Sequence, residues 1–332
     1  MADSSLLIGD IGGTNARFAL ADDTAPGFFD EKTLRCADFN SAELAIRHYL
    51  ESVGRTSPDV ICLAAAGPVV ENRIRMTNNH WTLTTAEIAA EFSTNSVRLL
   101  NDFHAIAYCI PFLTDDDCAP IDLPEPRSLP ATDYTIAILG PGTGLGAVGL
   151  RKHGEHLIPI AGEASHGGFA PETRVQLDIL MALRERFDRV SSERVVSGPG
   201  LENIYWALGQ IHGEKLPKLT AAEIFAKAGD NSDPHAAEAV ALFFEILGQV
   251  AGDLALTLGA EDGVYIAGGI VKRYPDLLAN SRFRSGFESK GTHRSLMERI
   301  PTQLILHEQP GLLGAAYCAL ELLRATEVMP TS

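Results

Sequence analysis

Two glycine-rich turns carry residue types that bind phosphate. The first lies in "IGDIGGTNARF" and comprises Gly9, Asp10, Ile11, Gly12, Gly13 and Thr14. The second lies in "LGPGTGLG" and contains Gly140, Gly142, Thr143 and Gly144. Glycine allows positive φ and lets backbone N–H groups approach an anion without an intervening Cβ. The first turn is neither a Walker A loop nor a dinucleotide fingerprint, because both spacings are absent and a second strand is expected after it.

Asp10 is an unusual neighbour for phosphate. A carboxylate and a phosphate repel each other, so their proximity is explained best by a Mg²⁺ ion that both contact. The first turn and Asp10 together therefore predict a metal–nucleotide site. The alternative is an ordinary hairpin that happens to contain an aspartate.

Asn101 and Asp102 follow a short apolar strand. In open α/β sheets, ligands bind at the carboxyl ends of parallel strands, where such side chains are presented. An aspartate is ionised at neutral pH and can accept the proton of an attacking hydroxyl group. The alternative is that Asn101-Asp102 caps the following helix.

Polar side chains on a small-residue loop provide a third candidate. Glu163 and His166 lie in "IAGEASHGGFAP", and Glu193 lies in "SSERVVSGPG". Carboxylates and an imidazole can hydrogen-bond a polyhydroxylated ligand; a surface loop histidine is the alternative. Zinc is a rival use, but no third ligand follows at typical spacing. Gly268-Gly269, at the end of "VYIAGGIV", offers side-chain-free backbone to a nucleotide, or simply a turn.

The elements that must position these residues alternate between strand and helix, which is typical of an α/β fold. A Thr84-x-x-Glu87 capping box is expected to start one helix. The acidic, proline-rich residues 114–133 are expected to connect two folded units. Gly13-Thr14 and Gly142-Thr143 lie at corresponding places in the two halves, by repetition or by coincidence. The expected strands are 6–8, 18–20, 60–65, 97–100, 134–139, 264–266 and 303–306, and the expected helices are 42–53, 84–92, 104–113, 171–188, 236–258 and one ending near 325.

Composition restricts the class of protein. The 332 residues, 45% hydrophobic and 21% charged, are those of a globular protein of about two domains. The net charge of −16 argues against nucleic-acid and anionic-membrane partners. No signal peptide or membrane-spanning apolar stretch is expected, so a cytoplasmic location is predicted. The five scattered cysteines are expected to be reduced and mostly buried.

Taken together, these stretches resemble the bacterial glucokinase family, in the sugar kinase branch of the actin, Hsp70 and hexokinase superfamily. The similarity covers nearly the whole chain in family order. The matching segments are "GDIGGTNARF", "TNNHW", "LLNDF", "LGPGTGLG", "GEASHGGFAP", "SSERVVSGPGLENIY", "YIAGGIV" and "QPGLLGAA".

The resemblance implies two ribonuclease-H-like α/β domains around a cleft, with mixed sheets flanked by helices. Residues 1–113 plus about 311–332 would form the small domain and 114–310 the large one. The protein would phosphorylate the 6-hydroxyl of glucose with ATP and Mg²⁺, and it would be a homodimer. Asp102 would be the general base, and Asn101, Glu163, His166 and Glu193 would hold the sugar. Asp10 would face Mg²⁺, while Gly9 to Thr14, Gly140 to Gly144 and Gly268-Gly269 would bind ATP.

One segment departs from the family pattern. Where the family has Glu-Gly-Gly-His-x-Asp-Phe, this chain has Ala164, Ser165 and Gly168. If either replaced glycine needs positive φ, the loop would be strained by about 1 kcal/mol or more. A kinase for another hexose therefore stays an alternative. A non-catalytic sugar-sensing regulator and an actin-like ATPase without an acceptor are further alternatives. Such regulators usually carry an N-terminal DNA-binding helix-turn-helix, which is not expected here because the first turn begins by residue 9 and the net charge is −16.

Overall fold

The computed structural model describes residues 5–76, 78–122 and 128–328. Parts of the predicted domain ranges, of the 114–133 connection and of the "TNNHW" motif therefore lie outside the described residues. The chain divides into two compact units, one of residues 1–114 with 307–332 and the other of residues 115–306. Each unit contains a mixed sheet flanked by helices, which confirms the predicted α/β class.

The first unit is built on a five-stranded sheet with the order β3-β2-β1-β4-β7. β1, β2 and β3 are antiparallel neighbours, whereas β1, β4 and β7 are parallel. A small hairpin of β5 and β6 adds a second sheet. The strands are β1 (Leu6–Ile11), β2 (Asn15–Ala21), β3 (Phe28–Arg35), β4 (Val60–Ala65), β5 (Arg73–Arg75), β6 (Thr82–Thr84) and β7 (Ser96–Asn101).

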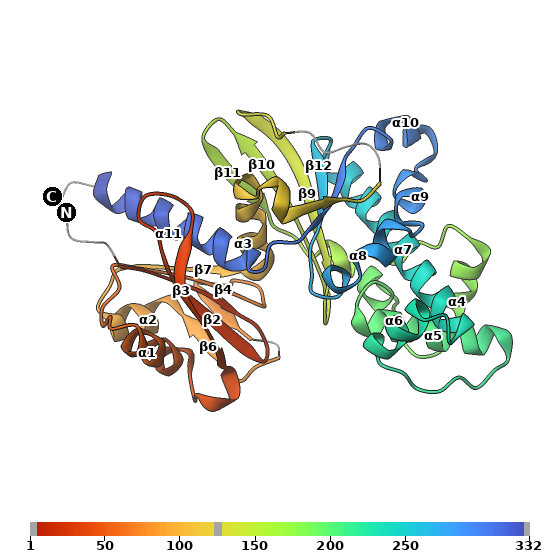
Figure 1. Ribbon diagram of the computed structural model, residues 1–332, viewed down its shortest axis with the longest axis horizontal. Helices are drawn as coiled ribbons and strands as arrows, with labels where there is room; N and C mark the ends of the chain where they lie inside the picture. Colours follow the sequence, from red (N-terminus) through yellow and green to blue (C-terminus); the bar gives the residue numbers. More distant parts are fainter. Residues whose placement is uncertain (1–4, 77, 123–127, 329–332) are drawn as a thin grey trace. The chain divides into compact units, whose positions relative to one another are not determined.

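Four α-helices complete the described part of the first unit. In Figure 1, α11, at the blue end of the chain, lies beside α3; it also packs on β1 and β4 of the five-stranded sheet. Helices α11 and α3 approach closely at small residues, because a Cβ added to Gly314 would overlap the Ala105 carbonyl. The helices are α1 (Ala42–Ser52), α2 (Thr85–Phe92), α3 (Asp102–Cys109) and α11 (Pro310–Val328), with 3₁₀ turns η1 (Cys36–Asp38) and η2 (Ile110–Phe112).

The second unit repeats the same sheet plan. Its order is β11-β10-β9-β12-β13-β8, in which β9, β10 and β11 are antiparallel and β9, β12 and β13 parallel. The β1–β2 and β9–β10 turns thus occupy the same position in the two sheets. The similarity between Gly13-Thr14 and Gly142-Thr143 therefore reflects a repeated topology. The strands are β8 (Cys118–Pro120), β9 (Asp133–Pro141), β10 (Leu145–His153), β11 (His156–Ile160), β12 (Gly263–Ile266) and β13 (Thr302–Ile305).

Helices bury most of their apolar side chains against this second sheet and one another. The longest, α7, packs on α5, α6, α9 and β9, with Phe243 and Phe244 fully buried. The helices are α4 (Arg174–Arg184), α5 (Gly198–His212), α6 (Ala221–Gly229), α7 (Pro234–Leu258), α8 (Pro275–Ala279), α9 (Phe283–Glu288) and α10 (Arg294–Met297). The 3₁₀ turns are η3 (Asp115–Asp117), η4 (Ala164–His166), η5 (Ser192–Arg194), η6 (Val271–Arg273) and η7 (Gly291–His293).

Several sequence expectations need correction. By length and composition alone, helix α7 could cross a membrane, because it contains an 18-residue window with a mean hydropathy of 1.6. The expectation that no apolar stretch is this long was therefore wrong. However, 78% of that window is buried inside the protein, as in a core helix. The capping box is also wrong, since the Thr84 hydroxyl donates to the Glu87 carboxylate and accepts no helix N–H.

Other differences concern segment limits. The predicted connection is not all loop, because β8 within it pairs with β13. The helix expected over 171–188 is shorter, since it starts after Thr173 and ends at Arg184. The helix expected from His104 begins two residues earlier and becomes 3₁₀ at Ile110. All five cysteines are free, and four are buried, as predicted.

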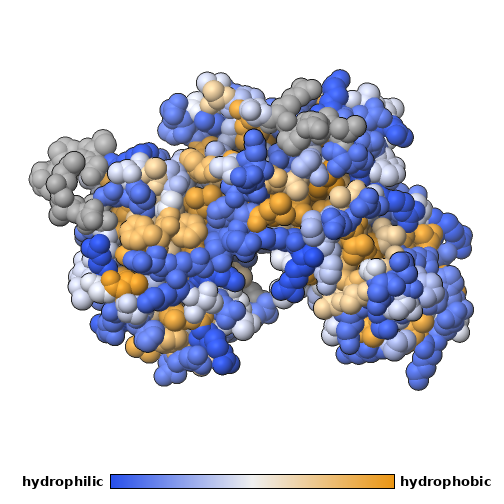
Figure 2. All heavy atoms as spheres, in the orientation of Figure 1, coloured by the Kyte–Doolittle hydropathy of each residue, from blue (hydrophilic) through white to orange (hydrophobic). Residues whose placement is uncertain are grey.

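The surface agrees with the acidic composition. Figure 2 shows a mostly hydrophilic face with scattered hydrophobic clusters. The most exposed large apolar side chains include Val70 and Met181, each 62% exposed. Scattered residues of this kind are normal on a protein surface and need no partner to explain them.

Candidate active site

Three of the predicted polar residues meet at one edge of the first sheet. In the parallel register, Ile11, Ala65 and Asn101 lie side by side on β1, β4 and β7. Asp10 is one residue before this row, and Asp102 is one residue after it. The carboxyl ends of the parallel strands therefore bring Asp10, Asn101 and Asp102 together, at the edge where open α/β sheets bind ligands.

Asn101 is largely occupied by the protein itself. Its Oδ1 accepts hydrogen bonds from the N–H groups of Phe103 (2.9 Å) and His104 (3.4 Å), which caps α3. Its Nδ2 donates to the Gly67 carbonyl at 3.1 Å. The helix-cap alternative is thus correct for this residue. The cap also fixes the direction in which α3 leaves the sheet, and therefore the position of Asp102.

Asp102 is the first residue of α3 and is only partly exposed. Burial raises the pKa of its carboxyl to about 6, and the nearby negative charge of Asp10 adds to the rise. A hydrogen bond of 2.9 Å from the Phe103 N–H opposes the rise in pKa. A carboxylate with this pKa is mostly ionised at pH 7 and is a stronger base than an ordinary aspartate, as proton abstraction from a hydroxyl requires.

Asp10 has few compensating partners. The nearest cation, Arg17, is 3.9 Å from its carboxylate, and burial raises the pKa of Asp10 despite it. The side chain remains 25% exposed. A Cβ placed on Gly311, at the start of α11, would lie 3.0 Å from the Asp10 carboxylate. A partly exposed carboxylate with so little positive charge around it fits a Mg²⁺ ligand, since hard cations prefer oxygen donors.

Two glycines of the first turn, Gly9 and Gly13, are explained by close packing rather than by φ. Neither Gly12 nor Gly13 has positive φ. A Cβ on Gly9 would lie 2.8 Å from the Leu63 side chain, and one on Gly13 would lie 2.8 Å from that of Asn78. Positive φ, which glycine allows, is not used at Gly12 or Gly13, and the close contacts favour glycine at positions 9 and 13.

The second turn lies against the start of a helix. The Gly142 carbonyl accepts a hydrogen bond of 2.8 Å from the N–H of Gly198, the first residue of α5. Gly268, at φ +101°, passes so close that a Cβ would lie 2.5 Å from the Pro141 carbonyl. Gly140–Gly144, Gly268-Gly269 and the α5 N-terminus are therefore neighbours. Helix N-termini favour anions. Helix α5 was not among the predicted helices, although "SGPG" at residues 197–200 is a typical helix start.

Glu163 and His166 lie on an exposed 3₁₀ turn. Their side chains are 70% and 55% exposed, and Glu163 Oε2 lies 3.9 Å from His166 Nε2. The turn is joined to the segment of Glu193 by a hydrogen bond of 2.9 Å from the Ser192 N–H to the Gly167 carbonyl. The structure thus brings the segments of all three predicted sugar ligands of this unit together.

Glu193 also contacts the second glycine turn. Its Oε2 accepts a hydrogen bond of 3.0 Å from the Leu145 N–H. A Cβ on Gly144 would come within 2.5 Å of the same oxygen. The Glu193 carboxylate therefore connects the predicted sugar segment to the predicted phosphate turn, and Gly144 has no side chain because Glu193 occupies that space.

The predicted loop strain is absent. Ala164 and Ser165 lie in η4, and neither has positive φ. Gly167, at φ −55°, also avoids the left-handed region. The condition for strain is therefore not met, because this sequence builds a short 3₁₀ turn in which neither replaced position needs positive φ.

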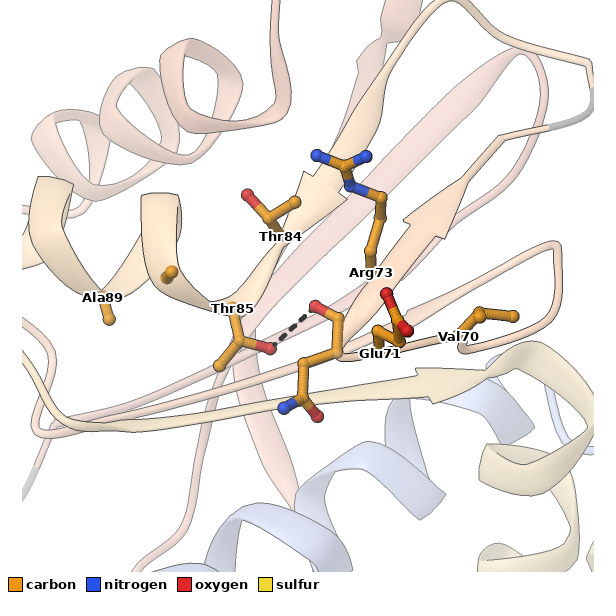
Figure 3. Close-up of a pocket in the computed structure, with 8 residues that line it drawn as sticks. Val70, Glu71, Arg73, Thr84, Thr85 and Ala89 are labelled. Atoms are coloured by element: carbon orange, nitrogen blue, oxygen red, sulfur yellow. Dashed lines mark hydrogen bonds between the residues drawn. The ribbon is translucent and has the colours of Figure 1, made fainter.

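A pocket of about 560 Å³ lies elsewhere, between the β5–β6 hairpin and α2. Figure 3 shows its lining, in which the Thr85 hydroxyl donates to the Asn72 carbonyl; the distance is 3.1 Å. Its lining includes Arg73, Thr84 and Ala89. None of the predicted site residues lines it, so it is not a candidate for the reaction centre.

Comparison with known proteins decides the family. The sequence profile of the Glucokinase family matches residues 7–322. The chain belongs to the glucokinase family. It is 40% identical over 317 residues to a glucokinase of Nitrobacter hamburgensis, covering 95% of this chain and 97% of that protein. It is 43% identical over 316 residues to a glucokinase of Caulobacter sp. strain K31, covering 93% of each.

A solved structure agrees with this family assignment. A glucokinase from an Antarctic psychrotroph superimposes with a TM-score of 0.86 at 34% identity, covering 97% of this chain and all of that one. The sequence resemblance to the glucokinase family is thereby confirmed, and so is its sugar-kinase fold. The family consists of ATP-dependent hexose kinases, so this chain is an enzyme of that class.

Proposed function

We propose that this protein transfers the γ-phosphate of ATP to the 6-hydroxyl of glucose, giving glucose 6-phosphate and ADP. The observation that carries the proposal is Asp102, a carboxylate of raised pKa at the edge of a parallel sheet, one residue after the helix cap that positions it. The two relatives that match this chain over nearly their full length are named glucokinase, which supports glucose as the sugar.

The Asp102 carboxylate accepts the proton of the sugar hydroxyl as the hydroxyl oxygen bonds to the γ-phosphorus. The bond between that phosphorus and the β–γ bridging oxygen breaks, and ADP leaves. Phosphoryl transfer needs little covalent chemistry from the protein, so positioning and electrostatics provide most of the rate enhancement. The pKa of about 6 keeps Asp102 in its basic form at neutral pH.

For ATP, we assign the backbone of Gly9 to Thr14, that of Gly140 to Gly144 and Gly268-Gly269. The nearby N-terminus of α5 adds a positive dipole end suited to phosphate. Asp10 would hold Mg²⁺, which when bound neutralises charge on the phosphate oxygens. Replacing Asp10 with Asn should therefore raise the Mg²⁺ concentration needed for half-maximal rate; an unchanged Mg²⁺ dependence would remove Asp10 from this role.

For glucose, we assign Asn101, Glu163, His166 and Glu193 besides Asp102. The exposed pair on η4 is available to a ligand, and Glu193 uses one oxygen for the Leu145 N–H. Because η4 is unstrained, the departures from the family pattern at Ala164 and Ser165 give no reason to expect a sugar other than glucose. We further propose that residues 1–114 with 307–332 act as the small domain and 115–306 as the large domain; a homodimer and a cytoplasmic location stay predictions.

The test replaces Asp102 with Asn, which keeps the shape and the acceptor for the Phe103 N–H. Glucose-dependent ADP production should fall by about 10²–10⁴-fold, while calorimetry should still detect glucose binding. Near-normal turnover in this variant would exclude Asp102 as the base. A wild-type protein that binds glucose but releases no ADP would instead support the alternative of a non-catalytic sugar sensor.

A further inference from the structure

A group of metal-ligating side chains lies apart from the residues assigned to the reaction. His212, His235 and Glu238 each offer one ligand atom, and these atoms all lie within 4.8 Å of one another. Glu214 adjoins them, with its Oε2 3.1 Å from His235 Nε2. Within the described part of the chain, these residues form the one group of three or more histidine, cysteine or acidic side chains with such spacing.

The backbone holds these side chains in place from two helices, α5 and α7, which pack against each other (Figure 1). His212 is the last residue of α5, and Gly213 at φ +71° ends the helix. His235 and Glu238 lie three residues apart at the start of α7, which places them on one face. A hydrogen bond of 2.7 Å from the Tyr205 hydroxyl to Asp233, the N-cap of α7, ties the two helices together beside the group.

The ligand set selects the class of ion. Two imidazoles with carboxylates suit Zn²⁺ and related transition metals, whereas Mg²⁺ and Ca²⁺ prefer oxygen donors alone. Ligand atoms about 2.0–2.1 Å from a tetrahedral ion are roughly 3.3 Å apart, so the side chains must close slightly. His212 and Glu238 can do so because they are 42% and 41% exposed, while His235 is 19% exposed and serves as the fixed ligand.

Local charge favours a cation. Glu238 Oε2 lies 3.6 Å from the His212 Nε2, and Glu214 Oε2 lies 3.1 Å from the His235 Nε2. Asp233 adds a third carboxylate next to them, which accepts a hydrogen bond from the His235 backbone N–H. The carboxyl end of α5 adds a partial negative charge at His212. The alternative to a metal site is a pair of ordinary surface histidine–carboxylate contacts, such as the one of 2.7 Å between His153 and Asp133. Three potential ligands from two helices, with Glu214 just after the end of α5 as a fourth, distinguish this group from that pair.

We propose that His212, His235 and Glu238, with Glu214 as a fourth ligand, form a site for a divalent transition-metal cation that joins the end of α5 to the start of α7. The ion is structural. The opposite end of α5 contacts Gly142, and the two ends of this 15-residue helix are about 21 Å apart at a rise of about 1.5 Å per residue. The site is independent of the proposed kinase activity.

The experiment titrates Zn²⁺ into metal-stripped, full-length protein by calorimetry, with metal content measured after dialysis. The wild type should bind one Zn²⁺, and its melting temperature should rise by about 5 °C at a Zn²⁺ concentration about 100-fold above Kd, with no such rise from Mg²⁺. The His212→Asn, His235→Asn double variant should bind Zn²⁺ at least 100-fold more weakly. His153→Asn, which removes a histidine from a simple pair, should bind as the wild type does.

A second variant guards against misfolding at the more buried His235. Glu238→Gln changes only an exposed side chain, and it should weaken Zn²⁺ binding at least tenfold while leaving the metal-free melting temperature within about 1 °C. The proposal is overturned if the wild type shows no saturable Zn²⁺ site, or if Glu238→Gln and the double variant bind as tightly as His153→Asn. It is also overturned if Mg²⁺ competes with Zn²⁺ at equal concentration.

Discussion

Asp102 should lower the stability of the folded protein at the pH where it is useful for catalysis. Its pKa rises from 3.8 to about 6 on folding, chiefly through burial and then through the charge of Asp10. Because the folded value is the higher one, ionisation costs stability, and that cost develops as pH rises from about 4 through 6. The difference corresponds to at most about 3 kcal/mol at pH 7 and above.

Replacing Asp102 with Asn removes this cost, because the amide stays neutral and can still accept from the Phe103 N–H. The variant should therefore melt at a higher temperature than the wild type at pH 8, by up to about 10 °C, and at almost the same temperature near pH 4. Activity should fall by about 10²–10⁴-fold in the same variant. An increase in melting temperature at pH 8 is the informative result, since most substitutions at a partly buried residue lower the stability of the protein.

The assay is differential scanning fluorimetry of both proteins between pH 4 and 8, at constant ionic strength. Melting temperatures are compared because a chain of two units need not unfold in one step. Asp188→Asn, at an exposed position, serves as a matched control and should show no pH-dependent difference from the wild type. A variant that is less stable than the wild type at pH 8, or a difference that does not change with pH, would refute the reasoning.

Two glycine substitutions test the packing around the site. Gly144→Ala should displace the Glu193 carboxylate, because the new Cβ would lie 2.5 Å from its Oε2. The KM for glucose in steady-state assays should then rise severalfold; an unchanged KM would show that Glu193 does not bind the sugar. Gly314→Ala should lower the free energy of unfolding by about 1–3 kcal/mol or more, since the Cβ would overlap the Ala105 carbonyl, and thermal melting would reveal it. In both tests, Gly229→Ala has open space for its Cβ and should behave as the wild type does.

Local sequence signals predicted the elements around the site well. The buried strand expected over 60–65 is β4, with the same bounds. Asn101 and Asp102, at the end of β7, lie at the carboxyl edge of the sheet next to Asp10, because the parallel strands β1, β4 and β7 end side by side. These features depend on short apolar runs and the residues that end them, which a sequence displays directly.

Contacts between distant segments could not be predicted in this way. The hydrogen bond from Leu145 to Glu193 joins residues 48 positions apart, and no periodicity marks it. The same holds for the approach of Gly268 to Pro141. The edge strand β8 was hidden in an acidic segment because it is only three residues long and pairs with β13 far along the chain.

The metal-ligating group illustrates the same limit. His212 and Glu214 precede His235 and Glu238 by more than twenty residues, so their spacing matches no compact ligand motif. Only the packing of α5 on α7 brings them within reach of one ion. The family resemblance, in contrast, depended on eight short segments in order, which together carried more information than any single motif.

The most direct test of the central claim measures ADP release by the wild-type protein with Mg-ATP and a panel of hexoses. Glucose should stimulate ADP release well above the other hexoses, with glucose 6-phosphate formed in equal amount, and the rate should fall tenfold per pH unit below about pH 6 as Asp102 is protonated. No stimulation by any hexose would contradict the proposed kinase activity. A rate that stays constant from pH 8 down to pH 5 would contradict the role of Asp102.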